Sequence, residues 1–133
     1  MKLEQAIHQR WAAAGALSAL LPAEKLSTGF SRESGTPYAV LVRRSGRNLF
    51  RTNAGDALDE IALAIHVWHH DHDAGRTIVE AVRAAFDSIA FDLPDGPRVV
   101  HMRRAGEAAA RHDGGTWQFT IEFLVQVYLP SGV

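Results

Sequence analysis

The chain has 133 residues, of which 47% are hydrophobic, and this length corresponds to one domain with a sizeable core. It contains no cysteine, which excludes a disulfide scaffold, a thiolate nucleophile and any cysteine-ligated zinc or iron–sulfur site. The 14 basic and 15 acidic residues give a net charge of −1, which argues against a bulk nucleic-acid binder and a basic membrane-binding surface.

No repeat or linker divides the sequence, so we expect one domain over residues 1–133. No apolar stretch near the N-terminus is long enough for a signal peptide or a membrane helix, and we therefore expect a soluble protein made in a cytoplasm. A first helix over residues 3–14 is indicated by apolar residues at a spacing of three or four: Leu3, Ile7, Trp11 and Ala14. An apolar helical turn over residues 16–21 follows and stops at Pro22, and the Ser- and Gly-containing stretch 24–36 is predicted to be a loop.

Two strands are predicted next. The first covers residues 38–44 and the second runs from about residue 58 to 69, with apolar residues on both faces. Between them, residues 45–48 (Ser-Gly-Arg-Asn) and 53–56 (Asn-Ala-Gly-Asp) have the composition of turns. Residues 49–51, which lie between these two turns, would extend a hairpin arm.

The second half of the chain begins with a predicted helix over residues 74–90, capped by Asp71 or Asp73. Its apolar face consists of Ile78, Val79, Val82, Ala85, Phe86 and Ile89. A turn at residues 93–97, a third strand at 99–104 and a polar loop at 106–115 follow. The strongest periodic signal is the strict alternation over residues 117–128, which predicts a long strand with one buried face.

This order of elements, α-β-β-α-β-β, favours an α+β fold: an antiparallel four-stranded sheet with the helices packed on one face. The other face of the sheet would be wet or covered by another subunit. In the core we expect the helix 74–90 to pack against the closing strand, so that Val82, Phe86 and Ile89 meet Phe119, Ile121 and Phe123.

A histidine cluster, defined here as His66, His69, His70 and His72, lies beside Asp71 and Asp73. Imidazoles and carboxylates suit zinc, nickel or copper. Adjacent residues of a strand point to opposite faces, however, so His69 and His70 could not share a metal there, and we favour a solvated strand–helix junction. There is no Gly-x-Ser-x-Gly elbow and no Gly-rich phosphate loop before a helix. We therefore predict no catalytic residues, no metal, no cofactor and no enzymatic activity.

Arginines are the remaining candidates for function. Four of them, Arg43, Arg44, Arg47 and Arg51, crowd the first hairpin, where the acidic residues nearest in sequence are Glu33 and Asp56. Arg103 and Arg104 end the third predicted strand. Two interpretations stay open. The side chains are solvated strand ends that pair with acidic neighbours, or they form a contact surface for an acidic partner, because Arg is favoured at interfaces and makes bidentate pairs.

Three segments together carry a resemblance to a known family. They are the N-terminal Ala-Leu-Ser-Ala-Leu-Leu-Pro with the later Pro-Tyr-Ala-Val-Leu-Val, the strand Ile-Ala-Leu-Ala-Ile-His-Val-Trp with its following helix, and the closing Gly-Gly-Thr-Trp-Gln-Phe-Thr-Ile-Glu-Phe-Leu-Val-Gln-Val. In this order they resemble the tail-completion (tail-terminator) proteins of long-tailed bacteriophages and gene transfer agents. The resemblance spans nearly the whole chain but is one of element order and loose pattern.

The resemblance implies a structural virion protein. Such proteins form a homo-hexameric ring that caps the tail tube, stops its polymerisation and offers the surface that joins the head. The expected partners are other copies of the chain, the tail tube protein and a neck or head-completion protein, with DNA free to pass through the lumen without sequence-specific binding and with no membrane. The expected location is the tail or neck of the virion, after assembly in the host bacterial cytoplasm.

We place the docking surface for these partners on Arg43, Arg44, Arg47 and Arg51. Two alternatives are a neck or head-closure adaptor of the same particle and, with less support, a small metal-dependent enzyme built on the histidine cluster.

Overall fold

The structure of the chain, a computed structural model, describes residues 1–31 and 35–132. Residues 32–34 of the predicted loop, including Glu33, lie outside the described residues. The elements, in chain order, are α1 (Leu3–Ala13), α2 (Gly15–Leu20), the 3-10 turn η1 (Ala23–Lys25), β1 (Leu26–Thr28), β2 (Tyr38–Arg51), β3 (Ala57–His69), α3 (His72–Phe86), β4 (Ile89–Asp92), β5 (Arg98–Arg111), the 3-10 turn η2 (Asp113–Gly115) and β6 (Trp117–Leu129).

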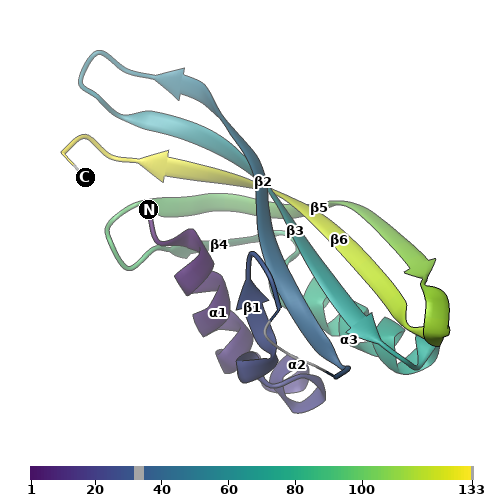
Figure 1. Ribbon diagram of the computed structural model, residues 1–133. Coiled ribbons are helices and arrows are strands. Elements are labelled where there is room, and N and C mark those ends of the chain that lie inside the picture. The colour runs from purple at the N-terminus through teal and green to yellow at the C-terminus, as the bar shows by residue number, and fades with distance from the viewer. Residues whose placement is uncertain (32–34, 133) are drawn as a thin grey trace.

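The strands form one curled sheet in the order β1-β2-β3-β6-β5-β4 (Figure 1). β1 runs parallel to β2, and every other pairing is antiparallel. The α+β class is confirmed, and the four predicted strands are the central four of the sheet. The predicted strand number is wrong, because a short strand is added at each border: β1, inside the predicted loop 24–36, and β4, inside and after the end of the predicted helix 74–90.

β2 is longer than predicted because the Ser-Gly-Arg-Asn segment at 45–48 is strand rather than turn. Two register shifts, between Arg43 and Ser45 and between Asn48 and Phe50, accommodate extra residues as bulges while pairing with β3 continues. The chain reverses only at the second predicted turn, where the Thr52 N–H donates to the Asp56 carbonyl at 2.8 Å. Residues 49–51 therefore belong to a hairpin arm, as predicted, and the far ends of β2 and β3 run past the helices (Figure 1).

β5 is also longer than predicted. The predicted polar loop at 106–115 is wrong over residues 106–111, which pair with β6 as far as Arg111 opposite Trp117. The strong strand pattern of β6 supplies the partner, so the ladder outweighs the low strand propensity of alanine. The reversal occurs at η2, where Gly114 and Gly115 have φ of 84° and 83°, a region that favours glycine.

α3 begins at His72, two residues before the predicted start, and ends earlier than predicted. The Asp71 carboxylate accepts a hydrogen bond from the Asp73 N–H at 3.0 Å, so Asp71 is the N-cap. The helix ends at Phe86, and Ser88 has a φ of 59°, which breaks the helical geometry. Ile89, predicted on the helix face, lies instead at the start of β4.

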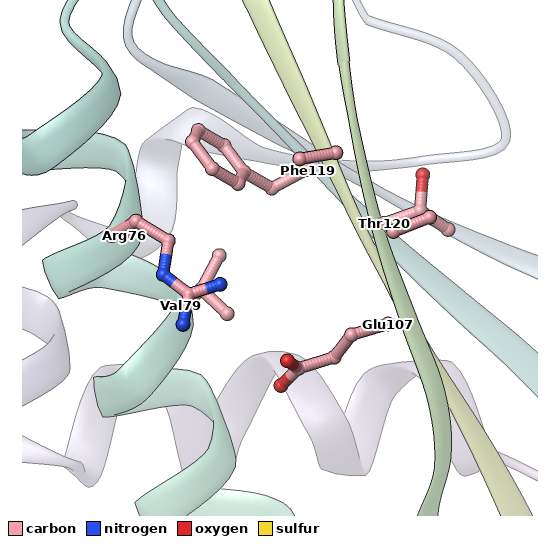
Figure 2. A pocket seen from close by; sticks show the side chains of 7 residues that line it. Arg76, Val79, Glu107, Phe119 and Thr120 are labelled. Atoms are coloured by element: carbon pink, nitrogen blue, oxygen red, sulfur yellow. The ribbon is translucent and has the colours of Figure 1, made fainter.

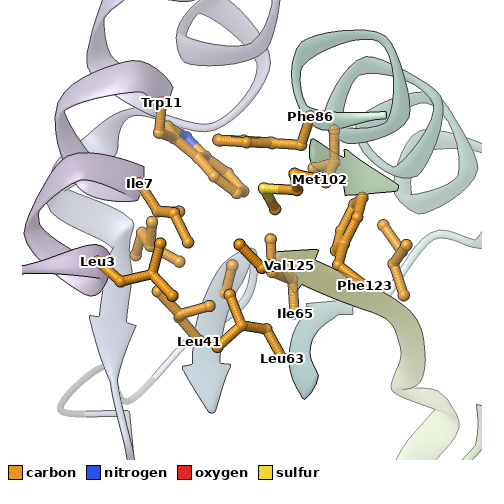
Figure 3. Close-up of a cluster of buried hydrophobic side chains, with 14 of the residues drawn as sticks. Leu3, Ile7, Trp11, Leu41, Leu63, Ile65, Phe86, Met102, Phe123 and Val125 are labelled. Atoms are coloured by element: carbon orange, nitrogen blue, oxygen red, sulfur yellow. The ribbon is translucent and has the colours of Figure 1, made fainter. Parts of the chain in front are cut away.

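The core lies on the face of the sheet that α1 and α3 cover (Figure 3). Phe86 of α3 meets Phe123 of β6 edge to face, with ring centroids 6.3 Å apart, which confirms the predicted helix–strand contact. Trp11 of α1 packs on the other side of Phe86, also at 6.3 Å, and its indole N–H donates to the Leu21 carbonyl at 2.8 Å. One buried cluster thus joins both helices to the central strands.

The other face of the sheet, here called the open face, carries the alternate residues of the same strands. On β6 these include Gln118, Thr120 and Glu122, which are half-buried or exposed. The described residues include no helix that is long and apolar enough to cross a membrane. The open face is mixed in character: polar side chains of β6 lie beside apolar residues of β2 and β3, such as Val42, Ala62 and Trp68.

Candidate functional site

All four arginines of the predicted docking surface lie on β2, and all four are exposed. They do not share one face. Arg43 points toward the helices and forms a bidentate ion pair with Glu4 of α1, in which its Nε lies 2.8 Å from Oε2. Arg47 lies on the open face opposite Glu60 of β3, and its Nη2 lies 3.0 Å from Oε1.

Two of the four arginines therefore pair with acidic neighbours, which is one of the two interpretations that the sequence left open. Glu4 and Glu60 are distant in sequence, and the fold brings them to β2 from α1 and from the paired strand. Within residues 1–31 and 35–132, Arg44 and Arg51 have no ion pair. Arg44 and Arg51 thus provide the uncompensated charge of the arm.

Arg104 of β5 belongs to a second acidic–basic group, centred on Glu107. The Glu107 carboxylate accepts a hydrogen bond from Arg83 Nε of α3 at 3.1 Å and lies 3.4 Å from Arg104 Nη1. Burial alone would raise the pKa of Glu107, but the hydrogen bonds and positive charge of Arg83 outweigh it, so the pKa lies below its usual range. Burial likewise acts to raise the pKa of Glu4, but the hydrogen bond and positive charge of the Arg43 guanidinium lower it, so this pKa also lies below its usual range.

The members of the histidine cluster each have a separate hydrogen-bond neighbour. His66 Nδ1 lies 2.9 Å from Thr120 Oγ1, His70 Nδ1 lies 3.3 Å from Thr36 Oγ1, and His69 Nδ1 accepts from the Asp71 N–H at 3.0 Å. Burial lowers the pKa of His66, and the nearby Arg44 lowers it further. In the part of the chain that the structure describes, no group of three or more His, Cys, Asp or Glu side chains could hold a metal.

Two hollows flank the sheet. One, of about 280 Å³, lies on the open face and is bordered by aromatic side chains of the first hairpin region, among them Phe30, Tyr38 and Trp68. The other, of about 240 Å³, lies between α3 and β5, where Arg76 and Glu107 face it from opposite sides and Phe119 borders it (Figure 2).

Sequence reasoning missed the acidic residues of the site. Glu60 could have been placed opposite Arg47 only from the register of β2 with β3, and two bulges shift that register. Glu122 of β6 was read only as one residue of an alternating strand, yet it lies on the open face beside Gly106 of β5. The site consists of charged side chains and exposed strand edges. Such groups are suited to contacts with other macromolecules.

Comparison with known proteins agrees with this description. No curated protein matches the chain. A solved structure described as the virion of a native gene transfer agent (GTA) particle contains a chain with the same fold: the TM-score is 0.72 at 15% sequence identity, with 96% of this chain and 95% of that chain covered. The model of the family described as "Tail completion protein gp17" matches residues 5–128. The chain therefore belongs to the tail completion protein gp17 family and is a structural protein of phage-type virions.

Proposed function

We propose that the protein is a tail terminator: a hexameric ring that caps the tail tube, ends its polymerisation and provides the surface that joins the DNA-filled head. The observation that carries this proposal is the match to the tail completion family over residues 5–128. The fold shared with a chain of a gene transfer agent virion supports it. A ring of identical copies needs a head-to-tail interface that closes on itself. Its partners are other copies of the chain, the tube protein and a neck protein.

The experiment is to image particles from a producing strain that lacks this protein. Loss of the terminator should give overlong tails, or finished tails detached from heads. Imaging of complete particles should show sixfold density for this chain at the head-proximal end of the tube. Tails of normal length with normally attached heads would overturn the proposal. Threefold or twelvefold density in the neck would favour the head-closure adaptor.

We also propose that the arginine arm of β2 (Arg43, Arg44, Arg47 and Arg51) contacts carboxylates on a neighbouring ring or an adjacent copy. Exposed ion pairs contribute only about 0–1 kcal/mol each, but repetition around a ring multiplies a small contribution. The best residues for a test are Arg44 and Arg51, because they have no ion pair among the described residues whose loss would change stability.

The double variant Arg44→Glu/Arg51→Glu should keep its melting temperature and fail to join heads to tails. A matched control is Arg98→Glu, which reverses the charge of an exposed arginine near the opposite border of the sheet, where it pairs with Asp92. This control should assemble normal particles. If the double variant instead gives normal particles that only eject DNA slowly, the arm faces the channel and the docking assignment is wrong.

A further inference from the structure

Both borders of the sheet are only half covered. β1 pairs with β2 only at Ala39–Leu41, and β4 pairs with β5 only as far as Met102. Beyond these points, no strand among the described residues pairs with the outer border of β2 over residues 42–51 or of β5 over residues 105–111. Backbone N–H and C=O groups on such a bare edge are a template for pairing with another chain.

We propose that the bare edge of β2 in one copy pairs with the bare edge of β5 in the next copy, so that one sheet continues from subunit to subunit. This inference rests on the proposed ring and names the interface that builds it. β2, β3, β6 and β5 are antiparallel neighbour by neighbour, so β2 and β5 run in opposite directions. Their junction between copies is therefore antiparallel. Each copy would use one border for each neighbour, which is the head-to-tail arrangement that a closed ring requires.

Charges on the open face complement each other across this junction. Gly106 has no side chain, and the Glu122 carboxylate of β6 leans over it: Oε2 would lie 3.6 Å from a Cβ at position 106. Glu122 has no ion pair within the described residues, and neither has Arg44. An antiparallel β2 strand with Arg47 opposite Gly106 brings Arg44 and Arg47 to the edge that the Glu122 carboxylate overhangs. The junction supplies the partner that each of these side chains lacks in the single chain.

The sizes of the side chains also fit. The bare edge of β5 is lined almost entirely by glycine and alanine: Ala105, Gly106, Ala108, Ala109 and Ala110. The bare edge of β2 ends in large apolar side chains, with Phe50 60% and Leu49 38% exposed. Phe50 lies opposite Leu58 on the open face, and in the antiparallel junction it would pack beside Ala105 and Gly106, at the start of the bare edge of a neighbouring β5. Such contacts remove apolar surface from water, which is the main favourable contribution to association.

Arginines near both edges restrict how the edges can meet. Arg103, Arg104 and Arg111 are exposed on β5, and like charges directly opposite one another destabilise a strand pair. Registers that place these residues against the arginines of β2 are therefore disfavoured. The antiparallel register that sets Arg47 opposite Gly106 and Ser45 opposite Ala108 places no arginine of β2 directly against an arginine of β5, so charge selects this register as well as contributing attraction.

Disulfide trapping tests the junction cleanly, because the natural chain has no cysteine. Ser45 and Arg47 on β2 and Ala108 and Ala110 on β5 are exposed and pair with open-face residues of the neighbouring strand. Each β2 position is changed to cysteine together with each β5 position, which gives four double variants. Directly opposed residues of antiparallel strands have Cα atoms about 4.5–5.5 Å apart, within the range of a disulfide.

Particles carrying each double variant are purified, oxidised and separated by electrophoresis without reductant. At least one double variant should give a ladder of cross-linked species that ends at the hexamer. The four single-cysteine variants should stay monomeric, because each copy then carries cysteine on only one of the two edges. The control Ala12→Cys/Ala19→Cys places two cysteines on exposed helical positions and should give no ladder.

The outcomes separate the junction from the proposed function. If imaging shows a ring of this chain at the tube end and no double variant gives a ladder, edge pairing is overturned and the terminator function stands. If tails carry no ring of this chain, the terminator function is overturned. A second measurement is charge exchange: Arg44→Glu and Glu122→Arg should each reduce particle yield, and the two together should restore it. A combined loss as large as the sum of the two would overturn the contact of the arm with Glu122.

Discussion

Truncating Phe86 to alanine tests how the core is held together. The Phe86 ring is fully buried between Trp11 and Phe123, so its removal opens a cavity that two other large aromatic side chains border. Phe→Ala changes at buried sites cost about 3–5 kcal/mol of the free energy of unfolding. A domain is typically stable by about 5–15 kcal/mol, so the variant should fold but be much less stable.

Denaturant titration of the free energy of unfolding is the assay, with Phe50→Ala as the matched control. Phe50 is the same residue type but 60% exposed on the arm, and its truncation should cost less than about 0.5 kcal/mol in the monomer. Measuring Phe86→Leu and Phe123→Leu singly and together gives the interaction free energy between the two rings, which we expect to be about 0.5–1.5 kcal/mol. A cost below about 1 kcal/mol for Phe86→Ala would refute the packing of α3 on β6.

Three further predictions concern the helix–sheet contact, the charged pairs and the histidines. Gly75→Ala should destabilise the protein by about 1–3 kcal/mol despite the higher helix propensity of alanine, because its Cβ would lie 2.3 Å from the Phe119 ring; a stabilised variant in thermal melts would show that the ring moves away freely. The lowered pKa values of Glu4 and Glu107 mean that the unfolded state binds more protons on acidification. The contribution of these two carboxylates to the free energy of unfolding should therefore be complete above their unfolded-state pKa of about 4.3 and decrease as the pH falls below it. Glu4→Gln should make this decrease smaller, as measured by urea titrations at a series of pH values. Purified protein should carry no stoichiometric transition metal, and EDTA should leave its melting temperature unchanged; a drop with EDTA would revive a metal site in the histidine cluster.

The elements with strong periodicity were predictable from the sequence. Leu3, Ile7 and Trp11 recur at helical spacing and lie buried on α1, and the alternating residues of β6 separate into a core face and an open face. These patterns predict structure well because one face of each element is buried, and burial determines the secondary structure more strongly than the intrinsic propensity of the residues does. The cap at Asp71 was likewise readable from its position before an apolar helical face.

Border elements and bulges were not predictable. β4 begins just beyond Ser88, whose left-handed backbone has no signature in a serine, and the strand at 106–111 is made of residues with low strand propensity. The same reason hid the ion pairs of the arm. Whether Arg43 meets Glu4 depends on the packing of α1 against β2, a contact between residues far apart in sequence. Sequence therefore indicated the arginines of the candidate site, and only the fold supplied their partners.

The central seam of the sheet has a consequence for how the chain folds. β3 pairs with β6 along its whole length, from Ala57 opposite Leu129 to His69 opposite Trp117, so the middle of the molecule joins segments far apart in sequence. Loops must close before such contacts form, which slows folding, whereas the β2–β3 and β5–β6 hairpins can form locally. Because β6 is the last strand and supplies Phe119, Phe123 and Val125 to the core, a nascent chain cannot complete that core until nearly all of it has left the ribosome. The subunit therefore completes its folding only after synthesis, when β6 pairs with β3 and joins the two hairpins.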